Sequence, residues 1–408
     1  MTAELSAALG FSVAAATAFA GTPIAIALAR RADFYDKPRG YRKHGAPTPL
    51  LGGAVVLAGF LVAAIVVGGT SVRLLVLIAC AIALWLVGTV DDRVAVAPKW
   101  RLLAETIAAL ALVAVGLGWK TSGGGGIDVV LTVVWIVGLV NAFNLMDNLD
   151  GACSTVGCVS AAGIGILAAI NGQPVLAGLA FGVAGGCAAF LRWNLAGPAK
   201  IFLGDGGSMT IGFLIAALAM ATGRALSHGG DAGLLAGALL VGLPILDTAL
   251  VSFSRKRRGV KLVTGGRDHL THRLLPALHT PRAVAGALGL MQAILCASAI
   301  AGDRWGTAAL GVFALGAVTF GAVTIGVLDT RRWRPARIAV GERFSDGQAR
   351  SRSVASIRGE QPRYPARRRP DTGRAHHRPA EHRWARHPGD YAGRGARFVR
   401  LSNDPGPR

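Results

Sequence analysis

Long apolar segments separated by short polar connections repeat along most of this chain. A membrane-spanning helix needs about 20 mainly apolar residues, and eleven segments approach or reach that length. They cover residues 5–29, 50–69, 74–90, 102–119, 127–146, 151–172, 174–191, 208–224, 232–253, 283–302 and 307–328. The pattern predicts an all-α fold, a polytopic integral-membrane helical bundle with about eleven transmembrane helices.

The first apolar segment contains a sequence at 18–20, Ala-Phe-Ala, that resembles a signal-peptidase site. A signal peptide starts with a positively charged region. Here the segment is preceded by Glu4 and no basic residue, and it is followed by Arg30 and Arg31. We therefore expect a helix that is retained.

Basic residues are distributed unequally between the connections. Connections after odd-numbered spans contain most of them, whereas those after even-numbered spans contain only Arg73, Lys120, Arg224 and Arg304. Cytoplasmic loops of membrane proteins carry the excess of Lys and Arg. We therefore place the odd-numbered connections in the cytoplasm and the amino terminus outside, in a multi-pass protein of the plasma membrane.

The net charge of +21 would suit a nucleic-acid-binding protein, but much of it lies after Thr330. That segment is rich in Arg, Pro, Gly and His and poor in apolar residues, so it cannot bury a core. We expect two parts, a transmembrane catalytic domain at 1–330 and a basic, disordered cytoplasmic tail at 331–408. The tail is either simply solvated or touches anionic lipid head groups, and no nucleic-acid partner is expected.

The five cysteines lie scattered through apolar stretches without paired spacing. They are Cys80, Cys153, Cys158, Cys187 and Cys296. This distribution is typical of small buried hydrophobic residues and excludes a disulfide framework or a cysteine zinc site.

Polar side chains are concentrated at the end of the fifth span, in residues 141–151 (NAFNLMDNLDG). Three of them and one glycine would share one helix face, because their spacing is i, i+3, i+4 and i+7. They are Asn144, Asp147, Asn148 and Gly151. One interpretation is an ordinary polar helix end. The other is a site for a metal ion and phosphate, since hard cations bind carboxylate and amide oxygens and ionisable groups at the bilayer edge are costly.

All other unusual polar motifs lie on the same predicted side of the membrane. They occupy residues 33–49, 91–93, 202–208 and 265–275. A transporter would instead be expected to carry polar groups near the middle of the membrane. The arrangement favours an enzyme that joins a water-soluble substrate to a lipid-borne one.

Two motifs offer carboxylates. Asp91 and Asp92 are adjacent, so keeping both ionised requires a cation or base nearby; the alternative is a role in helix capping. In the stretch 202–208, Phe-Leu-Gly-Asp-Gly-Gly-Ser, we expect Ser208 to cap the following helix, with the helix amides facing a phosphate beside Asp205.

Two further motifs offer cations. Lys43, in a proline-bounded segment before the second span, could pair with phosphate. The stretch 268–273, Asp-His-Leu-Thr-His-Arg, has no further ligands at zinc-site spacing, so diphosphate binding fits it better. Asp247, a lone carboxylate within the ninth span, is either functional or paired inside the bundle.

Together these motifs resemble the signature set of the polyprenyl-phosphate N-acetylhexosamine-1-phosphate transferases, glycosyltransferase family 4. The resemblance extends from about Phe34 to about Thr330, and the stretch 268–273 is closer to the GlcNAc-1-phosphate branch than to the peptidoglycan translocase branch. It implies transfer of a sugar 1-phosphate, expected to be GlcNAc-1-phosphate, from a UDP-sugar to polyprenyl phosphate at the cytoplasmic face, with release of UMP, in cell-envelope polysaccharide synthesis.

By this resemblance, Asp91, Asp92 and Asp205 are the catalytic residues, and Asp205 with Asn144 binds the metal, Mg²⁺ or alternatively Mn²⁺. The remaining substrate-binding residues are Lys43, Thr48, Asn144, Asp147, Asp150, Phe202, His269, His272 and Arg273. The two residues Lys43 and Thr48 would contact phosphate, and Phe202 would stack near the uracil. The partners implied are UDP-N-acetylhexosamine, polyprenyl phosphate and membrane lipids, and a homodimer stays open.

A phosphate monoester has its second pKa near about 6 and is largely dianionic at pH 7. The nucleophile therefore needs positioning and charge neutralisation more than a strong base. We favour direct attack by the lipid phosphate, with Asp91 or Asp92 as base, over a covalent aspartyl-phosphate route. Alternatives are a phospho-MurNAc-pentapeptide translocase activity, a lipid or solute transporter, or a silent family member, because Asn148 stands where the family usually has Gly.

Overall fold

The computed structural model describes residues 1–36, 47–226, 229–261 and 266–329. Lys43 and the predicted tail, residues 331–408, lie outside these ranges, so the expectations for them stay predictions. Within the described residues the chain is almost entirely helical, which confirms the predicted all-α membrane fold.

Thirteen helices and one short strand pair make up the described chain. The helices are α1 Ala3–Arg31, α2 Gly52–Val67, α3 Val72–Val94, α4 Pro98–Ala114, α5 Gly125–Met146, α6 Ala152–Ile170, α7 Pro174–Asn194, α8 Gly204–Ala225, α9 Gly229–Leu240, α10 Gly242–Arg258, α11 Leu270–Leu278, α12 Pro281–Trp305 and α13 Thr307–Leu328. The strands β1 Tyr35–Asp36 and β2 Thr48–Pro49 are antiparallel, with Tyr35 opposite Pro49 and Asp36 opposite Thr48.

Every predicted apolar span forms a helix. Among the described residues, eight helices are long and apolar enough to cross a membrane, and α9 with α10, bent by 74°, would make a ninth. The helices α2 and α4 have 16 and 17 residues and are shorter. The count of eleven spans therefore stays a prediction.

Local sequence explains where several helices begin. The hydroxyl groups of Thr2, Ser71 and Thr280 accept hydrogen bonds from the first turns of α1, α3 and α12 at 3.3, 3.3 and 3.1 Å. Such caps satisfy amides that have no partner within the helix. Proline occupies the first turn of α4, α7 and α12, where its missing N–H costs nothing.

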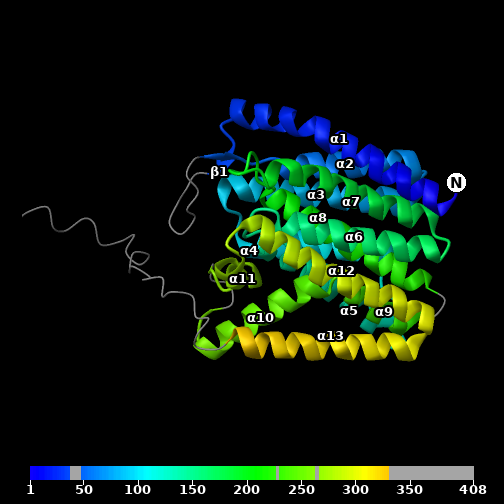
Figure 1. The fold of residues 1–408 in the computed structure, drawn as a ribbon. Helices are drawn as coiled ribbons and strands as arrows, with labels where there is room; N and C mark the ends of the chain where they lie inside the picture. Colours follow the sequence, from blue (N-terminus) through cyan, green and yellow to red (C-terminus); the bar gives the residue numbers. More distant parts are fainter. Residues whose placement is uncertain (37–46, 227–228, 262–265, 330–408) are drawn as a thin grey trace, which may run out of the picture. The chain divides into compact units, whose positions relative to one another are not determined.

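The odd-numbered connections of the predicted topology meet at one end of the bundle. Hydrogen bonds between them join Arg93 to Ala32 (3.2 Å), Gly151 to Asn194 (2.6 Å) and Arg282 to Leu195 (2.8 Å). Figure 1 shows this end with β1 and α11, away from the amino terminus. All predicted site residues that the structure describes belong to it.

The even-numbered connections meet at the other end. Their hydrogen bonds join Arg73 to Val115 (3.2 Å), Arg224 to Gly116 (2.5 Å), Ser122 to Asp231 (2.6 Å) and Asn171 to Asp303 (2.9 Å). Successive connections thus alternate between two ends, as a repeatedly crossing chain requires.

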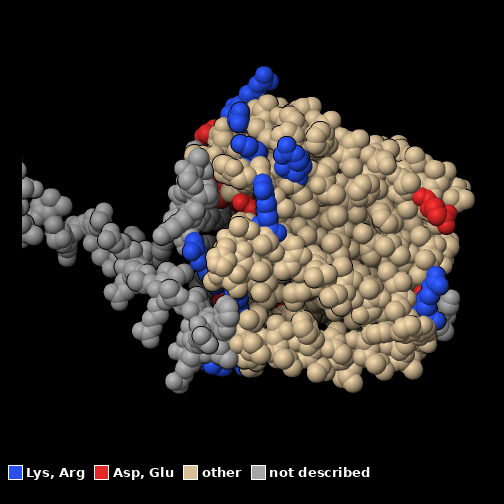
Figure 2. Space-filling view, viewed as in Figure 1, with Lys and Arg blue, Asp and Glu red and all other residues tan. Residues whose placement is uncertain are grey.

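The bundle is built around α8, which is buried along almost its whole length and lies between its neighbours in Figure 1. Peripheral helices expose apolar side chains instead, for example Ile24 (62%), Val130 (64%) and Leu290 (64%). On the face seen in Figure 2, the charged residues gather at the two ends and leave an uncharged belt between them. Such a belt is typical of a surface that faces lipid.

Candidate active site

The carboxylate of Asp92, at the end of α3, binds the first turn of α8. The backbone N–H groups of Asp205 and Gly206 donate to its two oxygens at 3.0 and 3.4 Å. A carboxylate is favourable there because the first amides of a helix are unpaired and carry partial positive charge. This contact brings two of the three predicted catalytic residues together.

Glycines make this approach possible. Gly204 has φ of +78°, and a Cβ at this position would lie 2.6 Å from a carboxylate oxygen of Asp92. A Cβ on Gly88 of α3 would lie 2.5 Å from the backbone nitrogen of Gly206. The glycines of the stretch 202–208 therefore serve close packing of α3 against α8.

The expected cap of α8 is wrong. The helix begins at Gly204, so Ser208 lies inside it and its hydroxyl donates to the carbonyls of Gly204 and Asp205, both at 3.3 Å. The first helix amides face Asp92 rather than open space. The anion at this helix end is a side chain of the protein itself.

Asp91 pairs with Arg101 of α4. Their nearest atoms, Oδ2 and Nη1, are 2.5 Å apart, and the backbone N–H of Val96 donates to the other carboxylate oxygen at 2.6 Å. The same guanidinium lies 3.6 Å from the carboxylate of Asp205. Arg101 therefore supplies the cation that the adjacent aspartates require.

Asn144, at the end of α5, completes this group. Its Nδ2 donates to the carboxylate of Asp205 and to the hydroxyl of Ser208, each at 3.1 Å. The carboxylate of Asp205 keeps 37% of its surface exposed, against 7% for Asp91. Asp205 is thus the member of the group that can meet a ligand.

The donor set fits a magnesium ion only in combination with a substrate. Among the described residues, no three His, Cys, Asp or Glu side chains form a ready-made metal site. Mg²⁺, however, is usually held by one or two carboxylates together with substrate phosphates. Asp205 can supply the carboxylate, whereas Asn144 would have to turn its amide over to present Oδ1.

The turn between α5 and α6 holds the two other predicted acidic residues, Asp147 and Asp150. Asp147 ends α5, and its backbone N–H donates to the carbonyls of Phe143 and Asn144 at 3.2 and 3.3 Å. Asp150 is partly exposed in the same turn. Both therefore lie at the rim of the carboxylate group.

The segment before α2 reaches the same end through the backbone. Phe202 donates its N–H to the carbonyl of Pro49 at 2.8 Å, and its own carbonyl accepts from Gly52 at 3.0 Å. Thr48, 7% exposed, lies in β2 next to this contact. The structure thus brings Thr48 and Phe202 to the start of α8.

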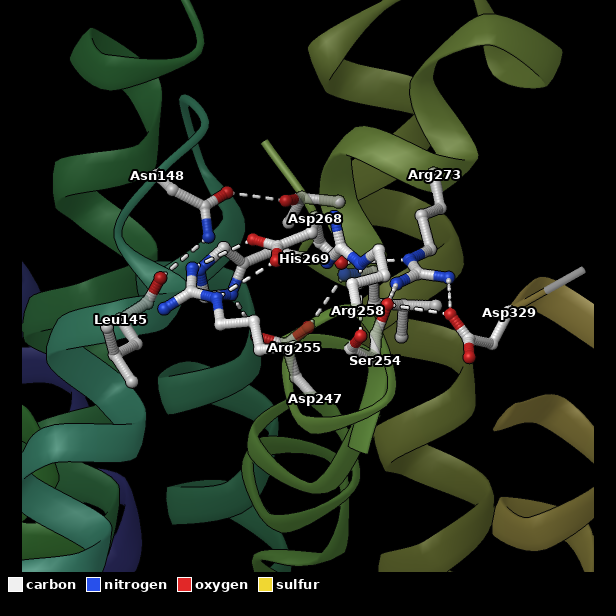
Figure 3. Close-up of polar contacts among 12 residues, drawn as sticks. Leu145, Asn148, Asp247, Ser254, Arg255, Arg258, Asp268, His269, Arg273 and Asp329 are labelled. Carbon is white, nitrogen blue, oxygen red and sulfur yellow. Dashed lines mark hydrogen bonds and ion pairs between the residues drawn. The ribbon is translucent and has the colours of Figure 1, made fainter. Parts of the chain in front are cut away.

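A second polar group lies between α10 and α11 (Figure 3). The carboxylate of Asp247 lies 2.9 Å from Nδ1 of His269 and accepts the backbone N–H of Leu270 at 2.6 Å. Asp247 and His269 are 1% and 3% exposed. Of the two interpretations of Asp247, the structure shows the paired one.

Arg273 is occupied by contacts within the protein. It is 4% exposed, and its guanidinium donates to the Asp268 carbonyl at 2.8 Å, the Leu328 carbonyl at 2.6 Å and the Ser254 hydroxyl at 2.9 Å. It lies 3.7 Å from Asp329 (Figure 3). In this state Arg273 joins α10, α11 and the end of α13.

Asp268 holds two further arginines. Arg255 binds both of its carboxylate oxygens at 2.9 and 2.8 Å, and Arg258 binds one at 2.7 Å. Burial alone would raise the pKa of Asp268, but these hydrogen bonds and positive charges outweigh it and lower the pKa to about 2. The cluster joins the end of α10 to Asp268, next to His269 and the first turn of α11, which contains His272.

Asn148 connects the two polar groups. Its amide nitrogen donates to the Leu145 carbonyl at 2.6 Å, and its amide oxygen accepts a short hydrogen bond from the hydroxyl of Thr271 (Figure 3). Neighbouring His272 has no hydrogen bond to another described residue, and burial, followed by the charges of His269 and Arg267, lowers its pKa to about 4. His272 is therefore neutral at pH 7 and free to meet a ligand.

Two residues that position this end were missed in the sequence. In the sequence Arg101 is only one of three basic residues close to the aspartates, with Arg93 and Lys99, and its bridge between Asp91 and Asp205 was not predicted. Asn194 accepts the N–H of Gly151 at 2.6 Å and donates to the carbonyl of Ile201 at 3.0 Å. Asn194 ends a mainly apolar helix as an uncharged amide two positions after Arg192, and this polar helix end was the available signal.

The comparisons with known proteins agree with this arrangement. Residues 74–223 match the family model described as glycosyl transferase family 4. Over this range the chain is similar to that family. The matched range contains Asp91, Asp92, Asn144 and Asp205.

Three relatives illustrate the similarity. The chain is 28% identical to an undecaprenyl-phosphate alpha-N-acetylglucosaminyl 1-phosphate transferase of Yersinia pestis, over 66% of this chain and 77% of the relative. It is 26% identical to the protein of the same name in Escherichia coli strain K12, over 66% and 76%. A Streptomyces coelicolor protein named only as a glycosyltransferase is 35% identical, over 63% and 61%.

Proposed function

We propose that this protein transfers GlcNAc-1-phosphate from UDP-GlcNAc to a polyprenyl phosphate, with release of UMP. The single observation that carries the proposal is the meeting of three helix ends, since α3, α5 and α8 contribute Asp92, Asn144 and Asp205 to one hydrogen-bonded group. The names of the relatives supply the substrate class.

The reaction exchanges one phosphoanhydride bond of the sugar-bearing phosphorus for another and leaves the sugar phosphoester intact. An oxygen of the polyprenyl phosphate attacks this phosphorus, the bond to the bridging oxygen breaks, and UMP leaves with that oxygen. Because the dianionic nucleophile needs no strong base, the main task of the protein is to position two anions and offset their charge. Arg101 supplies positive charge next to the carboxylate of Asp205.

A magnesium ion, when bound between Asp205 and the diphosphate, would neutralise the charge that develops on the departing UMP. Asp92 holds the start of α8, and Arg101 and Asn144 orient the carboxylate of Asp205. The neutral imidazole of His272 can donate a hydrogen bond to a phosphate oxygen. We assign Asp91 the role of positioning Arg101 and keep a base role for Asp92 as a hypothesis.

We also propose that this site faces the cytoplasm of the plasma membrane. The basic connections lie at its end of the bundle, and positive charge favours the cytoplasmic side. A UDP-sugar is too polar to cross the bilayer unaided, so a site supplied from the cytoplasm has to open on that side.

The test is transfer of label into lipid. Membranes containing the full chain would be mixed with radiolabelled UDP-GlcNAc, Mg²⁺ and polyprenyl phosphate, and we expect label in the lipid phase and UMP in the aqueous phase. D205N should lower the rate at least ~100-fold, because it removes an electrostatic contact to the reacting groups. D303N, a matched change at the opposite end of the bundle, should leave the rate unchanged.

Two outcomes would contradict the proposal. Label that stays in the aqueous phase for several UDP-sugars, with folded protein, would rule out the transferase. A transporter would instead move its solute equally well in the D205N protein and release no UMP. Recovery of a phosphorylated aspartate during turnover would replace direct attack by the covalent route.

A further inference from the structure

A cavity lies at the end of the bundle opposite the carboxylates, where the ends of α3, α4, α7 and α8 meet. Its volume is about 350 Å³. Arg73 and Arg224 line it, and Leu74, Leu77 and Leu176 contribute an apolar wall. None of these residues takes part in the site described above.

The two arginines reach the cavity from distant parts of the chain and share one loop. Arg73 donates through Nε to the carbonyl of Val115 at 3.2 Å, and Arg224 donates through Nη1 to the carbonyl of Gly116 at 2.5 Å. A guanidinium carries five N–H donors, so each keeps most of its donors for another acceptor. Two like charges held at consecutive carbonyls repel each other, and an anion between them would relieve that repulsion.

The carboxylates at this end do not neutralise these arginines. Asp128 binds Thr121 at 2.9 and 2.6 Å, and Asp231 binds Ser122 at 3.1 and 2.6 Å. Within the described ranges, no ion pair is formed by Arg73 or Arg224. Asp128 acts on the charge of Arg224 without forming an ion pair with it, so the positive charge of the cavity is only partly offset.

Basic residues are scarce at this end, which makes their convergence informative. Only four stand in the even-numbered connections, and two of them line this one cavity. The two arginines line the same cavity as the leucine side chains. A cavity with positive charge beside an apolar wall fits an amphipathic ligand with an anionic head group.

The cavity cannot be an extension of the transferase site. Arg224 and Asp205 stand 19 positions apart on the same helix, α8, which corresponds to about 28 Å at 1.5 Å per residue. A phosphate held by Arg224 therefore lies near the other membrane surface.

We propose that this cavity binds an anionic phospholipid of the opposite leaflet. The head-group phosphate lies between Arg73 and Arg224, and an acyl chain packs along Leu74, Leu77 and Leu176. The site is independent of the proposed transferase activity and would be retained in a protein that fails the transfer assay.

The proposal is tested by lipid binding to the purified full chain in neutral detergent. Native mass spectrometry with added phosphatidylglycerol should show saturable binding, with phosphatidylcholine at least about tenfold weaker. The double variant R73Q/R224Q should lose at least about tenfold in phosphatidylglycerol affinity, since hydrogen bonds to charged groups contribute this much. R304Q, an exposed arginine at the same end but outside the cavity, should bind as the wild type does.

Three results would overturn the proposal. They are equal binding of both lipids, unchanged phosphatidylglycerol binding by R73Q/R224Q, and displacement of the lipid by inorganic phosphate at equal concentration, which would indicate a free-phosphate site. If the double variant does not fold, L176W provides the test. This substitution narrows the cavity at its apolar wall and keeps both positive charges, so it must weaken lipid binding. If L176W binds phosphatidylglycerol normally, the proposal fails.

Discussion

At the scale of single residues, neighbouring aspartates have different tasks. Asp91 pairs with Arg101, Asp92 binds the backbone of α8, and Asp205 presents its carboxylate outward. From the sequence, all three aspartates are equally good candidates for catalytic residues. Only the partner of each carboxylate shows that Asp91 and Asp92 shape the site, whereas Asp205 can touch a ligand.

This difference predicts different effects on stability for two similar substitutions. D92N should lower the thermal midpoint as well as the activity, because its amide nitrogen would oppose one of the two N–H groups that the carboxylate accepts and leave a donor unsatisfied. D205N should lower the activity while leaving the midpoint within about 2 °C. Thermal unfolding in detergent, followed by the transfer assay, measures both. Equal midpoints for the two variants would refute the assignment.

His272 gives a dependence of stability on pH. Its pKa is about 4 in the folded protein, against about 6.5 for an unperturbed histidine. The unfolded chain therefore takes up the proton first, and the free energy of unfolding should fall as the pH drops from about 6.5 to about 4. The thermal midpoint of H272Q should depend less on pH in this window. Parallel curves for H272Q and wild type would contradict the shifted pKa.

At the scale of elements, the loop between α10 and α11 is fastened by buried charge. Asp268 binds Arg255 and Arg258, and Arg273 ties the loop to the end of α13. Arg255 is 2% exposed, so its positive charge is removed from water and is compensated by the carboxylate of Asp268. Asp268 and Arg273 are thus held in place before any substrate arrives, which limits the entropy that binding must remove.

D268N should therefore be strongly destabilising. Removing one partner of a buried ion pair costs about 3–5 kcal/mol, and here two arginines lose it. Because the pKa of Asp268 is lowered to about 2, the contribution should persist down to about pH 4 and disappear as the pH falls toward 2. The matched control is D231N, at an exposed pair with Ser122, which should leave the thermal midpoint nearly unchanged. Similar thermal midpoints for both variants would exclude the proposed role.

The contact between Asn148 and Thr271 joins the α5–α6 turn to α11. N148G introduces the glycine that is usual in the family and removes the acceptor of this hydrogen bond. T271V removes the donor. Each should raise the KM for the UDP-sugar about two- to tenfold, because a neutral hydrogen bond contributes about 0.5–1.5 kcal/mol. The double variant should be no worse than either single one. Additive effects would show that the two residues act separately.

At the scale of the whole molecule, successive connections alternate between two ends, and the carboxylate group lies at the more basic one. Among the described residues, hydrogen bonds join the odd-numbered connections to one another at one end of the bundle. They join the even-numbered connections at the other end. The transferase site and the proposed lipid cavity lie at opposite ends.

This arrangement predicts the sidedness of labelling. In intact cells, a membrane-impermeant maleimide should label T70C, in the exposed turn between α2 and α3, and leave K99C, at the start of α4, unlabelled until the membrane is permeabilised. The described native cysteines are buried or half-buried within helices, so they provide a low background. Labelling of K99C in intact cells would reverse the proposed orientation.

The sequence predicted the helices well, because apolar length and helix caps are local properties. It could not predict that Asp92 binds the start of α8, since the two residues in contact, Asp92 and Asp205, are 113 positions apart. The expected cap by Ser208 was wrong for the same reason. The first amides of α8 bind the carboxylate of Asp92 from α3, whereas the sequence suggested the nearby hydroxyl of Ser208. Arg101 and Asn194 were missed because their partners lie on other helices.

By itself, the sequence determined a polytopic helical membrane protein, its alternating connections and the set of polar motifs at one end. These follow from hydrophobic length and charge, which each segment carries on its own. Only the tertiary structure decided which carboxylate is exposed, which arginine is already occupied and where a charged cavity opens at the far end. Such properties depend on distances between helices, and those distances are fixed by close packing of residues that are far apart in the chain.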